Sequence, residues 1–225
     1  FKAKFKDGTE LIVKNQKTWE EFILKTHLFA KLPSAKLCEN YVSFEYGDRR
    51  LCMHFGKYGV STIFEIFAFD PYAEFMKEID VSGRQVVDIG AAFGDTAIYF
   101  IHKGARYVYA YEAFPGYASL ACKNINENGF SEFCKVYSVA VGGSKGTLEL
   151  DSEAIEMFGI DTAKRGAVIK VPVVTISDIV TIHCIDNAVL KLDTEGYEYE
   201  ILFNTPSNII RKFKYLLIEY HYGFE

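Results

Sequence analysis

Several patterns that mark common protein classes are missing from this sequence. No apolar run approaches the roughly 18 residues of a membrane span and no signal peptide is visible, so neither a span nor secretion is predicted. The 25 basic residues form no run and are outnumbered by 30 acidic residues, which gives a net charge of −5. Because binding to phosphates needs a basic face, nucleic acid is not expected as the main partner, and a small molecule or a glycan is favoured instead.

The cysteines also lack a functional pattern. They are odd in number, scattered, and without the C-x-x-C spacing of a zinc site or a redox pair. We interpret them as reduced residues that pack inside a cytoplasmic protein. The five positions are Cys38, Cys52, Cys122, Cys134 and Cys184.

The sequence does contain a nucleotide-cofactor pattern between residues 86 and 112. A strand ends in Asp88, a small-residue turn runs from Ile89 to Gly94, a helix follows, and a second strand closes on Glu112. Glycines let the backbone approach a ligand, and a carboxylate after the second strand can accept two hydrogen bonds from a ribose diol. The turn lacks the G-x-G-x-x-G of dinucleotide folds and its acid would repel a diphosphate, whereas S-adenosylmethionine is a cation without phosphate. We therefore predict S-adenosylmethionine as the cofactor.

The chain divides into two regions on pattern. With 225 residues it can form one α/β core and a small appendage. Residues 1–80 predict an α+β N-terminal lobe or cap, and residues 81–225 predict the cofactor-binding domain. The lobe is expected to hold two hairpins and two helices, at 4–13, 41–55, 19–29 and 63–76, the last interrupted near Pro71.

From Gln85 onward, strands and helices alternate, which predicts an α/β fold with a doubly wound, mostly parallel sheet. The expected strands are 85–89, 107–112, 134–140, 188–193 and 215–221, and the expected helices are about 94–103, 115–128 and 197–204. A hairpin excursion, with strands at 147–150 and 169–174 around a loop or short helix at 152–165, is predicted between the third and fourth strands.

Four motifs in order resemble the FkbM-type methyltransferases, over about residues 72–220. They are 86–96 (VVDIGAAFGDT), 140–142 (AVG), 174–178 (VTISD) and above all 190–198 (LKLDTEGYE). Two departures are that Ser177 stands where the family usually has an acid, and that the third-strand exit lacks the acid many methyltransferases use on adenine. The resemblance implies a class I, Rossmann-like methyltransferase fold. A sheet of this type normally adds an antiparallel pair after its fifth strand, so a further C-terminal segment is expected.

The resemblance implies transfer of a methyl group from S-adenosylmethionine to a hydroxyl on a sugar, lipid or natural product. Two alternatives stay open: an NAD-type oxidoreductase and a non-catalytic cofactor-fold module. Oligomeric state is also open, with a homodimer among the alternatives.

Glu112 is assigned to the ribose hydroxyls by its place at a strand end. Asp88 either contributes to the cofactor site or caps the amides of the turn, and apolar walls are expected around adenine. The expected cofactor contacts are Asp88, Gly90, Ala91, Phe93, Gly94, Thr96, Glu112, Ala113, Phe114, Ser138 and Ala140.

The expected catalytic residues lie at the ends of the fourth and fifth strands. They are Lys191, Asp193, Glu195 and His221. A lysine inside a central strand needs a carboxylate partner, and alternation puts Lys191 and Asp193 on one face, so either catalysis or a structural ion-pair network is indicated. His221 is the candidate general base, with a structural role as the alternative. Asp193, Glu195 and Glu219 have the oxygen ligands of a divalent ion, but their spacing does not establish a metal site.

Overall fold

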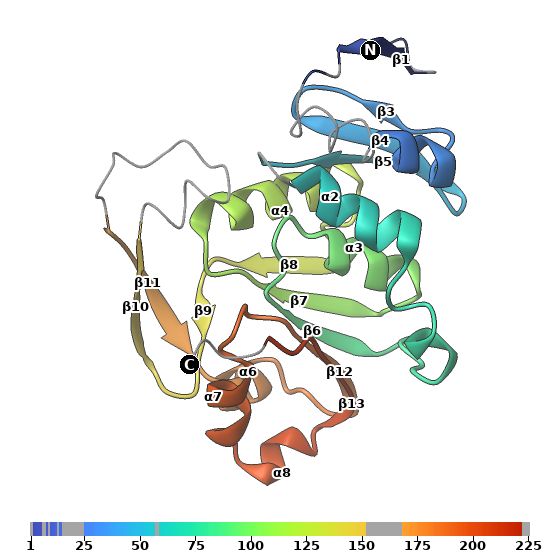
Figure 1. Cartoon of the computed structure of the whole chain (residues 1–225). Coiled ribbons are helices and arrows are strands. Elements are labelled where there is room, and N and C mark those ends of the chain that lie inside the picture. The colour runs from blue at the N-terminus through green and yellow to red at the C-terminus, as the bar shows by residue number, and fades with distance from the viewer. Residues whose placement is uncertain are drawn as a thin grey trace. The chain divides into compact units, whose positions relative to one another are not determined.

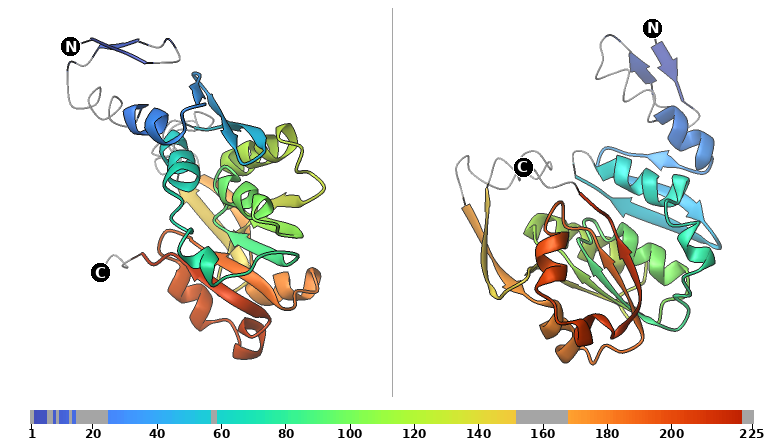
Figure 2. Two further views of the ribbon diagram at one scale, coloured as in Figure 1. Left: turned by 90° about the vertical axis from the view of Figure 1, so that its right-hand side faces the viewer. Right: turned by 60° about the horizontal axis from the view of Figure 1, so that its bottom comes forward.

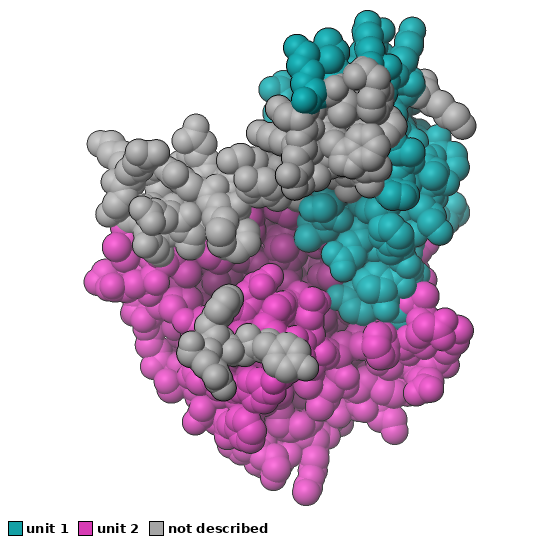
Figure 3. All heavy atoms as spheres, viewed as in Figure 1, with its two compact units in different colours: residues 1–72 teal, residues 73–225 magenta. Residues whose placement is uncertain are grey.

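Figure 1 shows the computed structural model of the chain, which describes residues 2–5, 8, 10–12, 14, 25–56, 59–151 and 168–221. The start of the helix expected at 19–29 and the whole loop expected at 152–165 lie outside the described residues. The chain forms two compact units, Phe1–Tyr72 and Ala73–Glu225, which Figure 3 colours separately. Each unit is described by itself.

The first unit contains both predicted hairpins. Its strands pair antiparallel as β1 (Lys2–Lys4) with β2 (Glu10–Ile12), and as β3 (Lys36–Leu37), β4 (Tyr41–Tyr46) and β5 (Arg49–His54) in a second sheet. Residues 25–31 are helical. Phe44 in β4 is fully buried and its ring lies 5.2 Å from that of Phe67, so aromatic packing holds the sheet to the segment that follows it.

The helix predicted at 63–76 is wrong in its bounds. The chain forms α2 (Gly59–Phe64), a π-helical turn η1 (Glu65–Phe69) and, after a break, a 3₁₀ turn η2 (Phe75–Lys77). Asp70 has φ +48° and precedes Pro71, and a residue before proline is disfavoured in the helical region. The predicted interruption near Pro71 is therefore confirmed, whereas the helical segment begins at Gly59 and not at Ile63.

The second unit is built on a five-stranded sheet in which every pairing is parallel. The order is β13-β12-β6-β7-β8, with β6 (Gln85–Ile89), β7 (Tyr107–Tyr111), β8 (Cys134–Tyr137), β12 (Ala188–Leu192) and β13 (Phe213–Ile218). The order reverses between β6 and β12, and ligands of open α/β sheets bind at such a switch point, outside the carboxyl ends of the strands. The predicted doubly wound α/β fold is confirmed.

Helices cover both faces of this sheet, as Figures 1 and 2 show. They are α3 (Asp95–His102), α4 (Pro115–Glu127), α6 (Ile176–Ile182), α7 (Glu198–Phe203) and α8 (Ser207–Ile210). Ile176 and Ile179 of α6 pack with Ile201 of α7 on a core that includes Val87 and Leu190. The interior strand β12 is buried at all five positions, which is typical of a parallel sheet with helices on both faces.

A small second sheet leaves the main one after β8. Here β10 (Gly146–Asp151) pairs antiparallel with β11 (Val168–Val174), which pairs parallel with β9 (Ala140–Val141). The hairpin excursion is confirmed, but the single strand predicted at 134–140 is wrong because it ends at Tyr137 and β9 joins the other sheet.

Three further expectations need correction. The last strand lies at Phe213–Ile218 and not at 215–221, so Glu219 and His221 follow it. Helix α6 was not expected, although Thr175 and Asp178 form its capping box. All five cysteines are free, as expected. Cys134 is buried, so packing explains it, but Cys38, Cys122 and Cys184 are exposed and packing does not explain them. Among the described residues, no helix is both long and apolar enough to cross a bilayer.

Candidate functional site

The small-residue turn joins β6 to α3 at the switch point and is tied to the neighbouring strand. The amides of Gly90 and Ala91 both donate to the carbonyl of Tyr111, at 2.9 and 3.1 Å. Asp88 is fully buried at the end of β6, and its Oδ2 accepts from Thr96 Oγ1 at 2.6 Å. Asp88 thus fixes the first turn of α3 through a side chain, and among the described residues its Oδ1 accepts no hydrogen bond.

Gly90 is required by a close approach of the chain to itself. Its φ is +78°, and a Cβ built there would lie 1.6 Å from the carbonyl oxygen of Asp193. The amide of Asp193 donates to the carbonyl of Ile89 at 3.1 Å, which holds the exit of β12 against the turn. The glycine therefore serves contact between two loops, a reason that the sequence pattern did not reveal.

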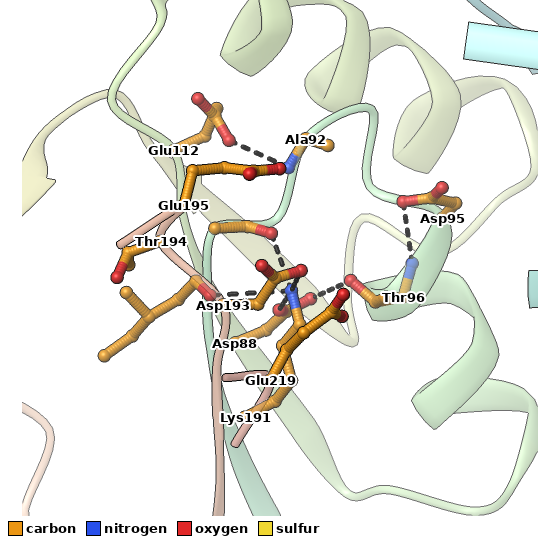
Figure 4. A network of polar contacts seen from close by, with 12 residues as sticks. Asp88, Ala92, Asp95, Thr96, Glu112, Lys191, Asp193, Thr194, Glu195 and Glu219 are labelled. Carbon is orange, nitrogen blue, oxygen red and sulfur yellow. Dashed lines mark hydrogen bonds and ion pairs between the residues drawn. The ribbon is translucent and has the colours of Figure 1, made fainter. Parts of the chain in front are cut away.

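A buried lysine links the two loops. Lys191 and Asp88 are register partners on β12 and β6, with side chains 3% and 0% exposed. Lys191 Nζ donates to Gly90 O at 2.7 Å and lies 3.4 Å from Asp88 Oδ1 and 3.3 Å from Asp193 Oδ2 (Figure 4). Asp88 Oδ1 has no hydrogen-bond partner in the described part of the chain. The ammonium of Lys191 is therefore its charge partner, as a buried carboxylate requires.

Glu112 follows β7 and is 6% exposed. Its Oε2 accepts from the amide of Ala92 and its Oε1 from the amide of Phe114, both at 2.8 Å. Burial raises the pKa of Glu112 to about 7, although the two amides and Lys191 lower it. Ala92 has φ +43° and was not expected in the site; nothing in the sequence marks it beyond its place in the turn.

An apolar cluster lies beside Glu112 in the chain. Ala113 and Phe114 pack against a buried group from the second sheet, formed by Ala140, Leu150 and Val171. Ser138, also expected at the cofactor, is exposed between β8 and β9. Ala113, Phe114 and Ala140 thus form one apolar cluster, while Ser138 lies on the surface.

Phe93 and Gly94 anchor the turn to α4. The ring of Phe93 is 3% exposed and lies 4.6 Å from that of Tyr117, while Asn124 Nδ2 donates to the Phe93 carbonyl at 2.8 Å. Gly94 has φ +77° and starts α3. The Phe93 side chain thus belongs to the core of this unit.

Asp95 is a buried acid that the sequence analysis missed. It is 2% exposed, its Oδ1 accepts from the amide of Thr96 at 3.0 Å, and its Oδ2 has no hydrogen-bond partner among the described residues. Burial raises the pKa of Asp95 to about 6, although Lys191 lowers it. An acid in the first turn of a helix is common, so the sequence offered no signal of this burial.

Carboxylates surround His221. Its Nε2 lies 3.4 Å from Glu195 Oε2 and 3.8 Å from Glu219 Oε1, and its Nδ1 lies 3.3 Å from Glu198 Oε1. Desolvation lowers the pKa of His221, but the carboxylates, Glu195 first, raise it to a net value above the ordinary one. Ligand atoms of Asp193, Glu219 and His221 all lie within 4.8 Å of one another, a spacing compatible with a divalent ion.

The four expected catalytic residues are thus brought to one edge of the sheet. Figure 4 shows three of them, Lys191, Asp193 and Glu195, together with Glu219 around the ends of β12 and β13, and Glu112 near the glycine turn. Lys191 is enclosed, whereas the Glu195 side chain is 75% exposed. The edge therefore combines an enclosed ion-pair network with exposed carboxylates and an imidazole.

Comparison with known proteins adds a family match. A family model described as the methyltransferase FkbM domain matches residues 88–225, more than half of the chain. No curated protein matches the sequence. Three solved structures are similar. Methyltransferase FkbM from Methylobacillus flagellatus KT is 15% identical, with 83% of this chain and 44% of that chain covered and a TM-score of 0.38. A SAM-dependent methyltransferase from Agrobacterium tumefaciens is 10% identical, with 71% of this chain and 41% of that chain covered and a TM-score of 0.40, and PRMT6-SAH is 18% identical, with 57% and 32% covered and a TM-score of 0.34. The chain spans less than half the length of each, and at these TM-scores the likenesses carry no argument of their own.

Proposed function

This chain belongs to the FkbM methyltransferase family, and we propose that it transfers a methyl group from S-adenosylmethionine to a hydroxyl oxygen of a sugar, lipid or natural product. The observation that carries the proposal is the buried carboxylate of Glu112 at the end of β7, beside a glycine turn at the switch point. S-adenosylmethionine supplies an activated methyl group on a sulfonium cation.

On this proposal the cofactor is held by residues of the second unit. Glu112 receives the ribose hydroxyls, and Ala113, Phe114 and Ala140 supply the apolar wall for adenine. The acids at the ends of β6 and β12, Asp88 and Asp193, give this edge a negative potential that suits a cationic ligand. The remaining expected contacts in the turn act through their backbone atoms. Lys191 holds this backbone by donating to Gly90 O, and Thr96 bonds to Asp88 at the start of the turn.

The acceptor is placed on the side of Asp193, Glu195 and His221. An alcohol is a poor nucleophile while protonated, and a positioned base contributes about 100- to 10,000-fold. His221 is the proposed base, because the carboxylates near it stabilise the imidazolium that forms when it takes the proton. Alignment of donor and acceptor contributes up to about 7 to 11 kcal/mol of the barrier.

The test is a transfer assay with methyl-labelled S-adenosylmethionine and pools of sugars, lipids and natural products that carry free hydroxyls. Asp193→Asn is expected to lose turnover and keep its affinity for S-adenosylhomocysteine, while Asp186→Asn, at an exposed acid paired with Lys212, serves as the matched control. Label found only on nitrogen or carbon would overturn O-methylation. Binding of cofactor with no turnover on any pool would instead favour a non-catalytic module.

A further inference from the structure

Glu198 lies outside the residues assigned so far, yet its carboxylate is the most heavily bonded acid near the site. It is the first residue of α7 and is 1% exposed. Its Oε1 accepts from the amide of Thr194 at 2.6 Å and from Thr194 Oγ1 at 3.0 Å, and both of its oxygens lie within 3.2 Å of the Gly196 amide that donates to them. Desolvation raises its pKa, but these donors lower it to a net value below the ordinary one.

These bonds hold a strained loop. Between Thr194 and Gly196 stands Glu195 with φ +55°, a left-handed conformation that is unfavourable for a residue with a Cβ. Strained residues persist where the surrounding contacts enforce them. Since Glu198 binds the amides on both sides of Glu195, its carboxylate fixes the conformation that displays the Glu195 side chain beside His221.

The same carboxylate also faces the imidazole. Glu198 Oε1 lies 3.3 Å from His221 Nδ1, while Nε2 faces the exposed acids Glu195 and Glu219. The contact of Nδ1 with Glu198 meets hydrogen-bond geometry, whereas Nε2 lies 3.4 Å and 3.8 Å from Glu195 and Glu219. Because an ionised carboxylate only accepts hydrogen bonds, the neutral imidazole that keeps the bond to Glu198 carries its hydrogen on Nδ1. Nε2 is then left with its lone pair free to take a proton.

We propose that Glu198 is a positioning residue: it sets the loop that presents Glu195 and fixes the Nδ1–H tautomer of His221, so that Nε2 is the basic nitrogen. The inference rests on the proposed role of His221 in methyl transfer. Glu198 would then orient His221 as a carboxylate orients the general base in other enzymes. When the acceptor hydroxyl gives its proton to Nε2, the Nδ1–H bond to Glu198 is kept and the imidazolium lies between Glu198 on one side and Glu195 and Glu219 on the other.

The direct test is the tautomer of His221, read from the nitrogen chemical shifts of labelled imidazole at alkaline pH, with the resonance assigned by His221→Asn. The wild-type chain is expected to show the Nδ1–H form. Glu198→Gln can place its carbonyl oxygen at the Oε1 position and still accept from the Thr194 amide and from Nδ1–H, so it is expected to keep the Nδ1–H form. Glu198→Ala removes this acceptor, so its His221 is expected to lose the preference for Nδ1–H. A wild-type Nε2–H form, or an unchanged Nδ1–H form in a folded Glu198→Ala, overturns the proposal.

Loop control is tested in the same samples by amide hydrogen exchange. The Thr194 and Gly196 amides are expected to exchange slowly in the wild type and at least tenfold faster in Glu198→Ala. In the conservative Glu198→Asp, exchange is expected to lie between these two rates, because the carboxylate is kept on a shorter side chain. The control Glu132→Gln, at an exposed acid, should change neither readout. Equal exchange in wild type and Glu198→Ala contradicts the loop role.

Binding of S-adenosylhomocysteine, followed in parallel, separates this inference from the proposed function. Retained binding in Glu198→Ala, together with loss of the Nδ1–H form, supports the role of Glu198. A correct tautomer without cofactor binding supports the geometry and counts against methyl transfer instead.

Discussion

Replacing Lys191 with methionine tests whether the buried ion-pair network holds the two loops of the site together. Methionine keeps the length of the side chain and removes the charge, the donor to Gly90 O and the partner of Asp88. Asp88 is fully buried, and its Oδ1 has no hydrogen-bond partner in the described chain to replace the ammonium. Removing one member of a buried pair costs about 3 to 5 kcal/mol, a large share of the total of about 5 to 15 kcal/mol that keeps a domain folded.

The assay is urea unfolding followed by far-UV circular dichroism, with Lys212→Met as the matched control. Lys212 forms a 3.0 Å pair with Asp186, but the two side chains are 47% and 73% exposed. The control should therefore lose less than about 1 kcal/mol. The double variant Lys191→Met/Asp88→Asn should recover part of the loss, since it removes the uncompensated charge, with a coupling of about 1 to 3 kcal/mol. A cost for Lys191→Met no greater than that of Lys212→Met, or no recovery in the double variant, would refute the reasoning.

Four further predictions concern the turn, Glu112 and the cysteines. Gly90→Ala should abolish cofactor binding and lower the melting temperature sharply, because the new Cβ meets the carbonyl oxygen of Asp193. The control Gly83→Ala, at φ +69° with open space around it, should cost only about 1 to 2 kcal/mol of stability. Equal melting temperatures for the two variants would contradict the close approach at Gly90. Calorimetric titrations should show that the affinity for S-adenosylhomocysteine falls by about tenfold per pH unit at pH values well below the pKa of Glu112, which is about 7. The reason is that only the ionised carboxylate accepts hydrogen bonds from both ribose hydroxyls. Glu112→Gln should remove this pH dependence. Because burial raises the pKa of Glu112, its contribution to stability is fully present at pH values below the ordinary carboxyl pKa and is lost as the pH rises through about 7. The stability of the wild type relative to Glu112→Gln should therefore fall between these two pH values. A relative stability that rises over the same pH range would contradict the prediction. Iodoacetamide should modify Cys38, Cys122 and Cys184 and spare Cys134, whose thiol pKa is raised by burial, as mass spectrometry of digests would show; equal labelling of Cys134 would argue against its burial.

The sequence predicted the frame of the second unit well because the relevant signals are local. Apolar runs bounded by turn residues placed β6 and β7 to within one residue, and the order of strands and helices indicated a parallel sheet. The neighbour relation of Lys191 and Asp193 also followed from the alternation of a strand, and the two side chains lie 3.3 Å apart.

The contacts that define the site depend on strand register, which no single segment encodes. The alternation of the strand placed Asp193 beside Lys191, but pairing of β12 with β6 also puts Lys191 against Asp88, about a hundred residues away. The same pairing brings Asp193 onto Gly90. The burial of Asp95 depends likewise on packing that follows only from the assembled fold.

The end of the last strand shows a different limit. The mostly apolar stretch at 213–218, which includes Lys214, and the residues after it show no sharp boundary, so the prediction at 215–221 lies two to three residues too late. Glu219 and His221 consequently stand on the chain after the strand, where Glu219 still donates its amide to Leu192. Their proximity to Asp193 survives this correction.

The central claim is that Glu112 and the glycine turn form an S-adenosylmethionine site, and calorimetric titration with S-adenosylhomocysteine tests it most directly. The account predicts binding of one equivalent to the wild-type chain, loss of binding in a folded Glu112→Ala, and no heat with NAD as the control. Binding that is unchanged in Glu112→Ala, or binding of NAD in place of S-adenosylhomocysteine, would contradict the claim.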